Sequence, residues 1–176
     1  EMVLSWNKQY SAQMICDLID VLAGLNEEHA NRVWELVQLW ATQAGEQDKA
    51  EVREKVRVSV LSRRVAKRVK REDWPGLTEK GRAAFKTLEP KDVVHKNAWL
   101  FKQGWVLDSA DELVGEPNFE TREKHIQGLR TAAVQEVVAA RGIEGLRALA
   151  EQGAAAEHIG ALCAASVLEG AQLLRF

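Results

Sequence analysis

The sequence has almost none of the signals that predict β-strands. No segment alternates apolar and polar residues over a useful length, and neither Asn-Gly nor Asp-Gly, the common hairpin dipeptides, occurs. Apolar residues recur instead at intervals of three and four along most of the chain, a spacing typical of amphipathic helices. The expected fold class is therefore all-α.

Cysteine is scarce as well. The chain holds only two, Cys16 and Cys163, far apart and each inside an apolar helical pattern. A disulfide scaffold needs more cysteines than this, so both are expected to be buried free thiols in a reducing compartment. Residues 1–9 also lack the basic region and apolar run of a secretory signal. The expected location is the cytoplasm.

No apolar run is long and clean enough to predict a membrane span. The most apolar stretch, residues 154–174, is interrupted by Glu157, His158 and Glu169 and is rich in alanine and glycine. The formal net charge is only −2, so the whole chain has no electrostatic attraction to nucleic acid or to an anionic membrane. Any such attraction must come from a local patch of charge.

Catalytic and metal-binding motifs are missing too. There is no phosphate-binding glycine loop and no His-Glu-x-x-His, and the four histidines are dispersed. Asp17 and Asp20 lie three apart on one helix face, but we interpret them as its solvated side because no twin pair stands out elsewhere. The sequence predicts no catalytic residue, no metal ligand and no cofactor.

What the sequence does contain is a succession of helices. Apolar residues make up 46% and charged residues 28% of 176 residues, as in an ordinary globular protein. The pattern predicts roughly seven to nine helices, in a multi-helix bundle or an irregular HEAT-like helical array without a detectable repeat. The main ones are expected at about residues 6–23, 26–44, 47–72, 78–88, 119–140, 143–152 and 155–174, with shorter turns in 91–107 and 109–115.

Caps and breakers set several of these boundaries. Asn26 and Thr78 are expected N-caps, and Gly142 is expected to separate two helices. Residues 1–176 are predicted to form a single helical domain, a fragment of a larger protein, because apolar pattern runs to both ends. A boundary within it would fall near residues 73–77 or 107–118, where breakers concentrate.

An arginine stripe is the feature that stands out most from background. Between Arg53 and Arg71, lysine and arginine accumulate with Glu54 as the single acid. On a helix, five of the arginines lie along one side, a spacing that suits phosphates or carboxylates: Arg53, Arg57, Arg64, Arg68 and Arg71. The stripe predicts an anion or acidic-partner site, or else an internal face matched by acids of neighbouring helices.

Tryptophan is the other departure, with six in the chain. Trp99, Phe101 and Trp105 gather in an irregular segment, where they form a candidate aromatic interaction cluster. The alternative is that these rings anchor the segment to the core. Trp34 and Trp40 lie six apart on one helix and are expected to face two different packing partners.

These observations favour a non-catalytic helical protein-interaction or regulatory module of a larger intracellular protein. Its expected partner is another protein or another domain of the parent chain, and a homodimer is a further option. One alternative is a nucleic-acid-binding helical module that uses the arginine stripe, which the near-neutral charge disfavours. The other is a helical accessory part of an enzyme whose catalytic domain lies elsewhere.

Overall fold

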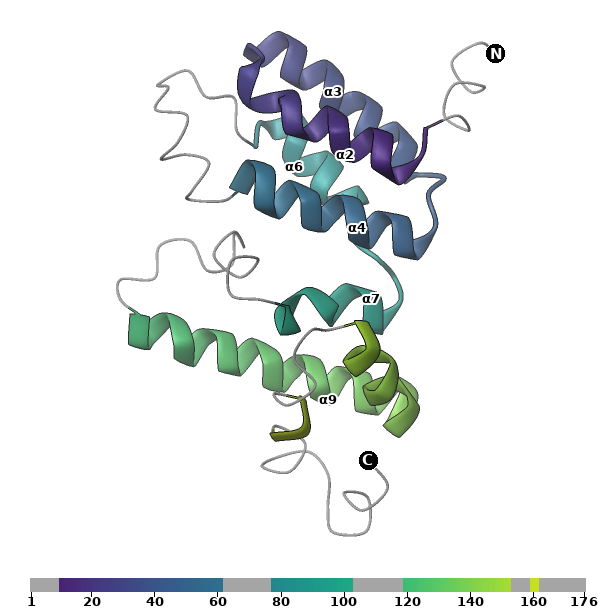
Figure 1. The fold of residues 1–176 in the computed structure, drawn as a ribbon, viewed down its shortest axis with the longest axis vertical. Coiled ribbons are helices and arrows are strands. Elements are labelled where there is room, and N and C mark those ends of the chain that lie inside the picture. The colour runs from purple at the N-terminus through teal and green to yellow at the C-terminus, as the bar shows by residue number, and fades with distance from the viewer. Residues whose placement is uncertain (1–9, 62–76, 103–118, 153–158, 162–176) are drawn as a thin grey trace. The chain divides into compact units, whose positions relative to one another are not determined.

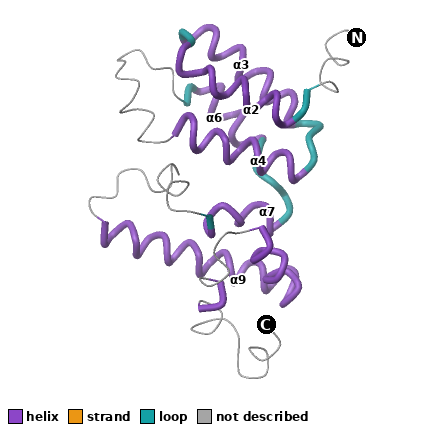
Figure 2. Tube along the Cα trace, viewed as in Figure 1, coloured by secondary structure: helices purple, strands orange, loops and turns teal. Residues whose placement is uncertain are grey.

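The computed structural model describes residues 10–61, 77–102, 119–152 and 159–161. Every regular element in these ranges is helical, and Figure 2 shows no strand among them. With the two halves of α9 counted separately, the described residues form seven α-helices, which confirms the predicted all-α multi-helix fold. None of these helices is long and apolar enough to cross a membrane.

The described residues fall into two compact units, divided between Pro90 and Lys91. The predicted boundaries near 73–77 and 107–118 lie almost entirely outside the described residues. Unit 1 contains α2 (Ala12–Val21), η2 (Leu22–Gly24), α3 (Glu27–Ala41), α4 (Glu46–Val56), η3 (Arg57–Leu61) and α6 (Glu79–Thr87). Unit 2 contains α7 (Val93–Asn97), η4 (Ala98–Phe101) and α9 (Phe119–Gln152).

Side-chain caps begin three of the α-helices of unit 1, namely α2, α3 and α6, while α4 begins after Gly45 without one. Asn26 Oδ1 accepts the backbone amide of His29 at 2.9 Å, and Thr78 Oγ1 accepts that of Gly81 at 3.1 Å. Both predicted N-caps are therefore confirmed. The predicted start of the first helix near residue 6 is wrong, because Ser11 has extended backbone and its hydroxyl caps a helix that begins at Ala12.

Two tryptophans of α3 organise the core of unit 1, where α3 packs on α6 and α2 on α4 (Figure 1). The fully buried Trp34 ring lies against Gly81 of α6. Trp40 faces another way, because its Nε1 donates to the carbonyl of Tyr10 at 2.9 Å. The two rings therefore have different packing partners, as their spacing predicts.

The helix expected over residues 47–72 is described only as far as Leu61. Its regular part ends at Val56, and η3 continues it as a π-helical stretch. Three valines spaced four residues apart, Val52, Val56 and Val60, are all buried in the core of unit 1. That side of the helix therefore faces inward, as the spacing indicates.

In unit 2, α7 lies along α9 (Figure 1). The helix α9 bends at Gly142, whose backbone (φ 59°, ψ −149°) is not helical, so residues 119–141 and 143–152 are two helices. This conformation is essentially restricted to glycine. The prediction that Gly142 separates two helices is confirmed.

Candidate functional site

The first two arginines of the predicted stripe face α6. Arg53 Nη1 donates to the carbonyl of Phe85 at 2.7 Å, and its guanidinium carbon lies 4.0 Å from the centre of the Phe85 ring. The guanidinium of Arg57 lies 5.3 Å from the same ring, and this residue is only 3% exposed. The half-buried Arg53 and the buried Arg57 thus both make cation–π contact with one phenylalanine.

This placement bears on the expected anion site. A guanidinium that is buried against a ring must leave that contact before it can reach a phosphate or carboxylate in solution. Arg64, Arg68 and Arg71 lie outside the described residues. The role of the stripe in anion binding stays a prediction. The contact of Arg53 and Arg57 with Phe85 is a structural role that their spacing did not predict.

The predicted aromatic cluster is described for two of its three members. Trp99 and Phe101 lie in η4 and are 9% and 0% exposed, and Trp105 lies outside the described residues. The buried Arg130 of α9 secures this turn by donating from Nε to the carbonyl of Leu100 at 2.8 Å. The burial favours the alternative in which the rings anchor the segment, and an interaction role for the cluster stays a prediction.

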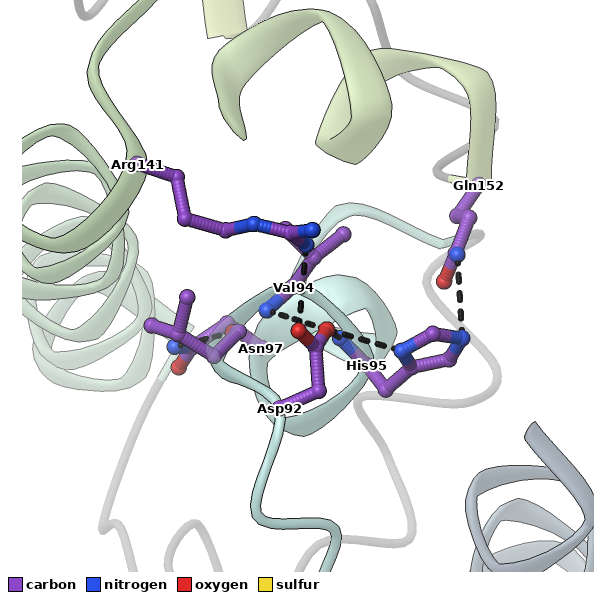
Figure 3. Close-up of polar contacts among 7 residues, drawn as sticks. Asp92, Val94, His95, Asn97, Arg141 and Gln152 are labelled. Atoms are coloured by element: carbon purple, nitrogen blue, oxygen red, sulfur yellow. Dashed lines mark hydrogen bonds and ion pairs between the residues drawn. The ribbon is translucent and has the colours of Figure 1, made fainter. Parts of the chain in front are cut away.

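Asp92 is the centre of a polar network that sequence patterns did not predict (Figure 3). Its Oδ1 accepts from the amides of Val94 and His95, each at 3.1 Å, and from the His95 ring Nδ1 at 2.8 Å. Its Oδ2 accepts from Arg141 Nη1 at 3.0 Å. One carboxylate therefore caps α7, orients a histidine and binds α9 just before the bend at Gly142.

His95 extends this network to the far end of α9. Its Nε2 lies 3.2 Å from Gln152 Nε2, so with Nδ1–H donating to Asp92, Nε2 accepts from the Gln152 amide. In enzymes, a histidine that an aspartate orients in this way can act as a general base. Here Nε2 faces an amide, which cannot serve as a nucleophile, so the arrangement ties α7 to both halves of α9.

A second carboxylate joins α7 to the first half of α9. Glu136 accepts from Lys96 Nζ at 2.9 Å and from Asn97 Nδ2 at 3.0 Å. These hydrogen bonds lower the pKa of Glu136 below its ordinary value of 4.5. Burial raises the pKa of Asp92, but the bonds from His95 and the charge of Arg141 outweigh it and hold that pKa below 3.8.

The free energy of unfolding of unit 2 is expected to fall as the pH drops below about 4. The unfolded chain binds protons at Asp92 and Glu136 more readily, since both pKa values are lowered in the fold. The stabilisation is complete above the ordinary pKa values and is lost as the pH falls through the lowered ones. Urea unfolding at a series of acidic pH values measures this slope.

Glu136→Gln tests the assignment of that slope. Removing one of the two carboxylates should flatten the pH dependence, while the neutral, exposed change Gln135→Ala on the adjacent residue should keep the wild-type slope. An unchanged slope in Glu136→Gln would mean that other carboxylates control acid unfolding.

Part of the Asp92 network carries a local signal that could have been found. Asp92 stands two residues after Pro90 and three before His95, which is the spacing of a cap after a breaker. Arg141 and Gln152 carry no such signal, because they reach the site only through the packing of α9 on α7. Among the described residues, no group of three or more histidine, cysteine, aspartate or glutamate side chains could hold a metal ion.

The helix α2 leaves an apolar strip uncovered, which we call the α2 face: Met14, Leu18 and Val21. Met14 is 47% and Val21 51% exposed, and they are the large apolar side chains that stand out to solvent in the described part of the chain. Leu18 is half-buried between them. The adjacent side of the helix, about 100° round the axis, packs Ile15 and Ile19 into the core.

Comparison with known proteins does not assign a function to the chain, so a proposal has to be based on the geometry described above. No protein-family model matches the chain, and neither the curated proteins nor the solved structures yielded a match.

Proposed function

We propose that this chain is a non-catalytic helical protein-interaction or regulatory module and that the α2 face is its contact surface. The observation that supports this is the exposure of Met14 and Val21, about half of each side chain, beside a well-packed core. Unit 1 has enough buried apolar surface to hold α2 in place, so the exposed strip is presented on a rigid element.

The spacing of the α2 face suits a partner helix or strand. Positions 14, 18 and 21 are separated by four and three residues and so lie along one side of the helix, over about 10 Å. Burying a large aliphatic side chain completely contributes about 1.5–3 kcal/mol. Two half-exposed anchors with Leu18 between them can therefore support a specific contact, provided that the rest of the interface adds to it.

The proposal also places the module in the cytoplasm. Cys16 is a buried free thiol in unit 1, which suits a reducing compartment. Burial raises the pKa of Cys16 to about 11, and the nearby carboxylates of Glu51, Asp17 and Asp20 act in the same direction. The thiol is thus inert rather than nucleophilic at neutral pH.

Site-specific photocrosslinking in the cells that express the protein tests the proposal. A photoreactive phenylalanine in place of Met14 or of Val21 is expected to give one adduct of the same mass at both positions. The same amino acid in place of Arg32, an exposed residue of α3, is the control and should give no such adduct. The captured protein is then purified and its affinity for the wild-type chain measured.

The double change Met14→Ser and Val21→Ser should weaken that purified complex at least about tenfold, because it removes both exposed anchors. Equal adducts from all three positions, or an affinity that the serine changes leave intact, would contradict the proposal. Circular dichroism of each variant excludes a loss of the helical fold as the cause.

A further inference from the structure

Arg130 is a buried cation of unit 2 that has no carboxylate bound to it in the described part of the chain. The residue is only 5% exposed, and its one hydrogen bond there runs from Nε to the carbonyl of Leu100 at 2.8 Å. The described ion pairs of unit 2 all join other side chains. An arginine is seldom buried without a paired acid, so this placement points to a group that is bound from outside.

The surroundings of Arg130 are apolar. Its neighbours one turn away on α9, Ile126, Ala133 and Val134, are all buried, and so are the rings on either side of Leu100 in η4. Burial lowers the pKa of Arg130, although a guanidinium stays protonated in proteins. A positive charge in such a medium attracts an oxyanion more strongly than the same charge would in water.

Glu123 is the acid whose charge acts on Arg130, from two turns earlier on α9. Seven residues of helix separate the two backbones by about 10 Å. The Glu123 carboxylate accepts a hydrogen bond from Gln127 at 3.2 Å, and no bond joins it to Arg130 within the described helix. Glu123 therefore weakens the positive potential at the guanidinium without occupying it.

The two Nη groups of Arg130 form the edge that is left for a ligand. The bond from Nε to Leu100 holds the planar guanidinium in one orientation. The Nη groups donate to no described residue, and neither is both sealed from solvent and without a partner, so this edge keeps contact with water. Two N–H groups in one plane match the two oxygens of a carboxylate.

We propose that Arg130 is a binding site for a single carboxylate group, either of a small organic acid or of an acidic side chain of another protein. A guanidinium that is already oriented loses little conformational entropy when it forms a bidentate pair. The charge of Glu123 favours a monoanion over a doubly charged phosphate, which it repels more strongly. The site belongs to unit 2 and does not depend on the α2 face.

NMR of the arginine side chains in the whole chain tests the proposal directly. Sodium acetate replaces sodium chloride at constant ionic strength, so that only the anion changes. We expect the guanidinium signals of Arg130 to shift saturably with acetate, and those of Arg147, an exposed arginine paired with Glu144, to show no saturation. Inorganic phosphate should bind more weakly than acetate. A capped Gly-Glu-Gly tripeptide, whose only charge is its side-chain carboxylate, distinguishes the two sources: it binds if the group comes from a protein and fails to bind if the site takes only a free acid.

Arg130→Lys keeps the positive charge and removes the planar pair of donors. This variant should need at least about tenfold more acetate than the wild type for the same rise in the urea midpoint of unfolding. Arg147→Gln is the matched control and should respond to acetate as the wild type does.

Three outcomes would overturn the carboxylate site. The absence of a saturable shift at Arg130 would show that water alone covers the Nη edge. Tighter binding of phosphate than of acetate would contradict the preference for a carboxylate, and an unchanged acetate response in Arg130→Lys would place the anion elsewhere. None of these results bears on the photocrosslinks at Met14 and Val21, so the two proposals are tested separately.

Discussion

Gly81→Ala is expected to destabilise unit 1 by about 1–3 kcal/mol, the cost of overpacking a well-filled core. A β-carbon at this position would lie 2.9 Å from Trp34 Cε2, 3.0 Å from Trp34 Nε1 and 3.1 Å from Leu77 Cδ1. The indole is fully buried and cannot swing away. The effect therefore opposes the usual result of Gly→Ala inside a helix, which stabilises by about 0.5–1 kcal/mol.

Urea unfolding followed by circular dichroism measures this difference. Gly128→Ala in α9 is the matched control, because a β-carbon there would meet nothing within 4 Å; it should stabilise the protein. In the Trp34→Phe background the cost of Gly81→Ala should shrink, since the smaller ring makes room. If both glycine changes stabilise the protein, the close approach of α6 to Trp34 is not present in solution.

Gly142→Ala should destabilise unit 2 by about 1–3 kcal/mol, because the conformation at Gly142 is strained for any residue with a β-carbon. Alanine would favour a continuous helix through the bend between residues 119–141 and 143–152. Straightening α9 would draw Gln152 away from His95 and Arg141 away from Asp92, because these two residues stand on either side of the bend.

Two measurements test this second prediction together. Chemical denaturation reports the loss of stability, and the NMR signals of the His95 ring report whether its contact with Gln152 survives. Gly128→Ala lies in the straight part of the same helix and should leave the His95 signals unchanged. An unaltered His95 spectrum in Gly142→Ala, with wild-type stability, would show that the bend is not required.

The parts of the fold that sequence could predict are those determined locally. Asn26 and Thr78 cap helices through their own neighbours, and Gly142 ends one through its own backbone, so each acts within a few residues. The start of α2 was predicted wrongly because the apolar spacing continues upstream of Ser11. The Ser11 hydroxyl caps the N-terminus of the helix through a local hydrogen bond, so the helix begins only after this residue. Apolar periodicity does not report such a bond.

The candidate sites depended on contacts between distant residues, which spacing does not report. The arginine spacing is consistent with a stripe on a helix, but only the fold shows that Arg53 and Arg57 meet Phe85. The α2 face was hidden for the opposite reason: the first helix has a broad apolar side, and sequence does not say which part of it the neighbours cover. Here they cover Ile15 and Ile19 and leave Met14 and Val21 exposed.

The position of α6 has a practical consequence for dividing the chain. The last helix of unit 1 supplies Gly81 to Trp34 and Phe85 to the two arginines, and Thr78 donates to Asn31 of α3 at 2.8 Å. A recombinant fragment that stops at Leu61 would leave an indole and two guanidinium groups without the surface that covers them. Expression of the first unit alone therefore has to extend to Pro90, where α6 is complete.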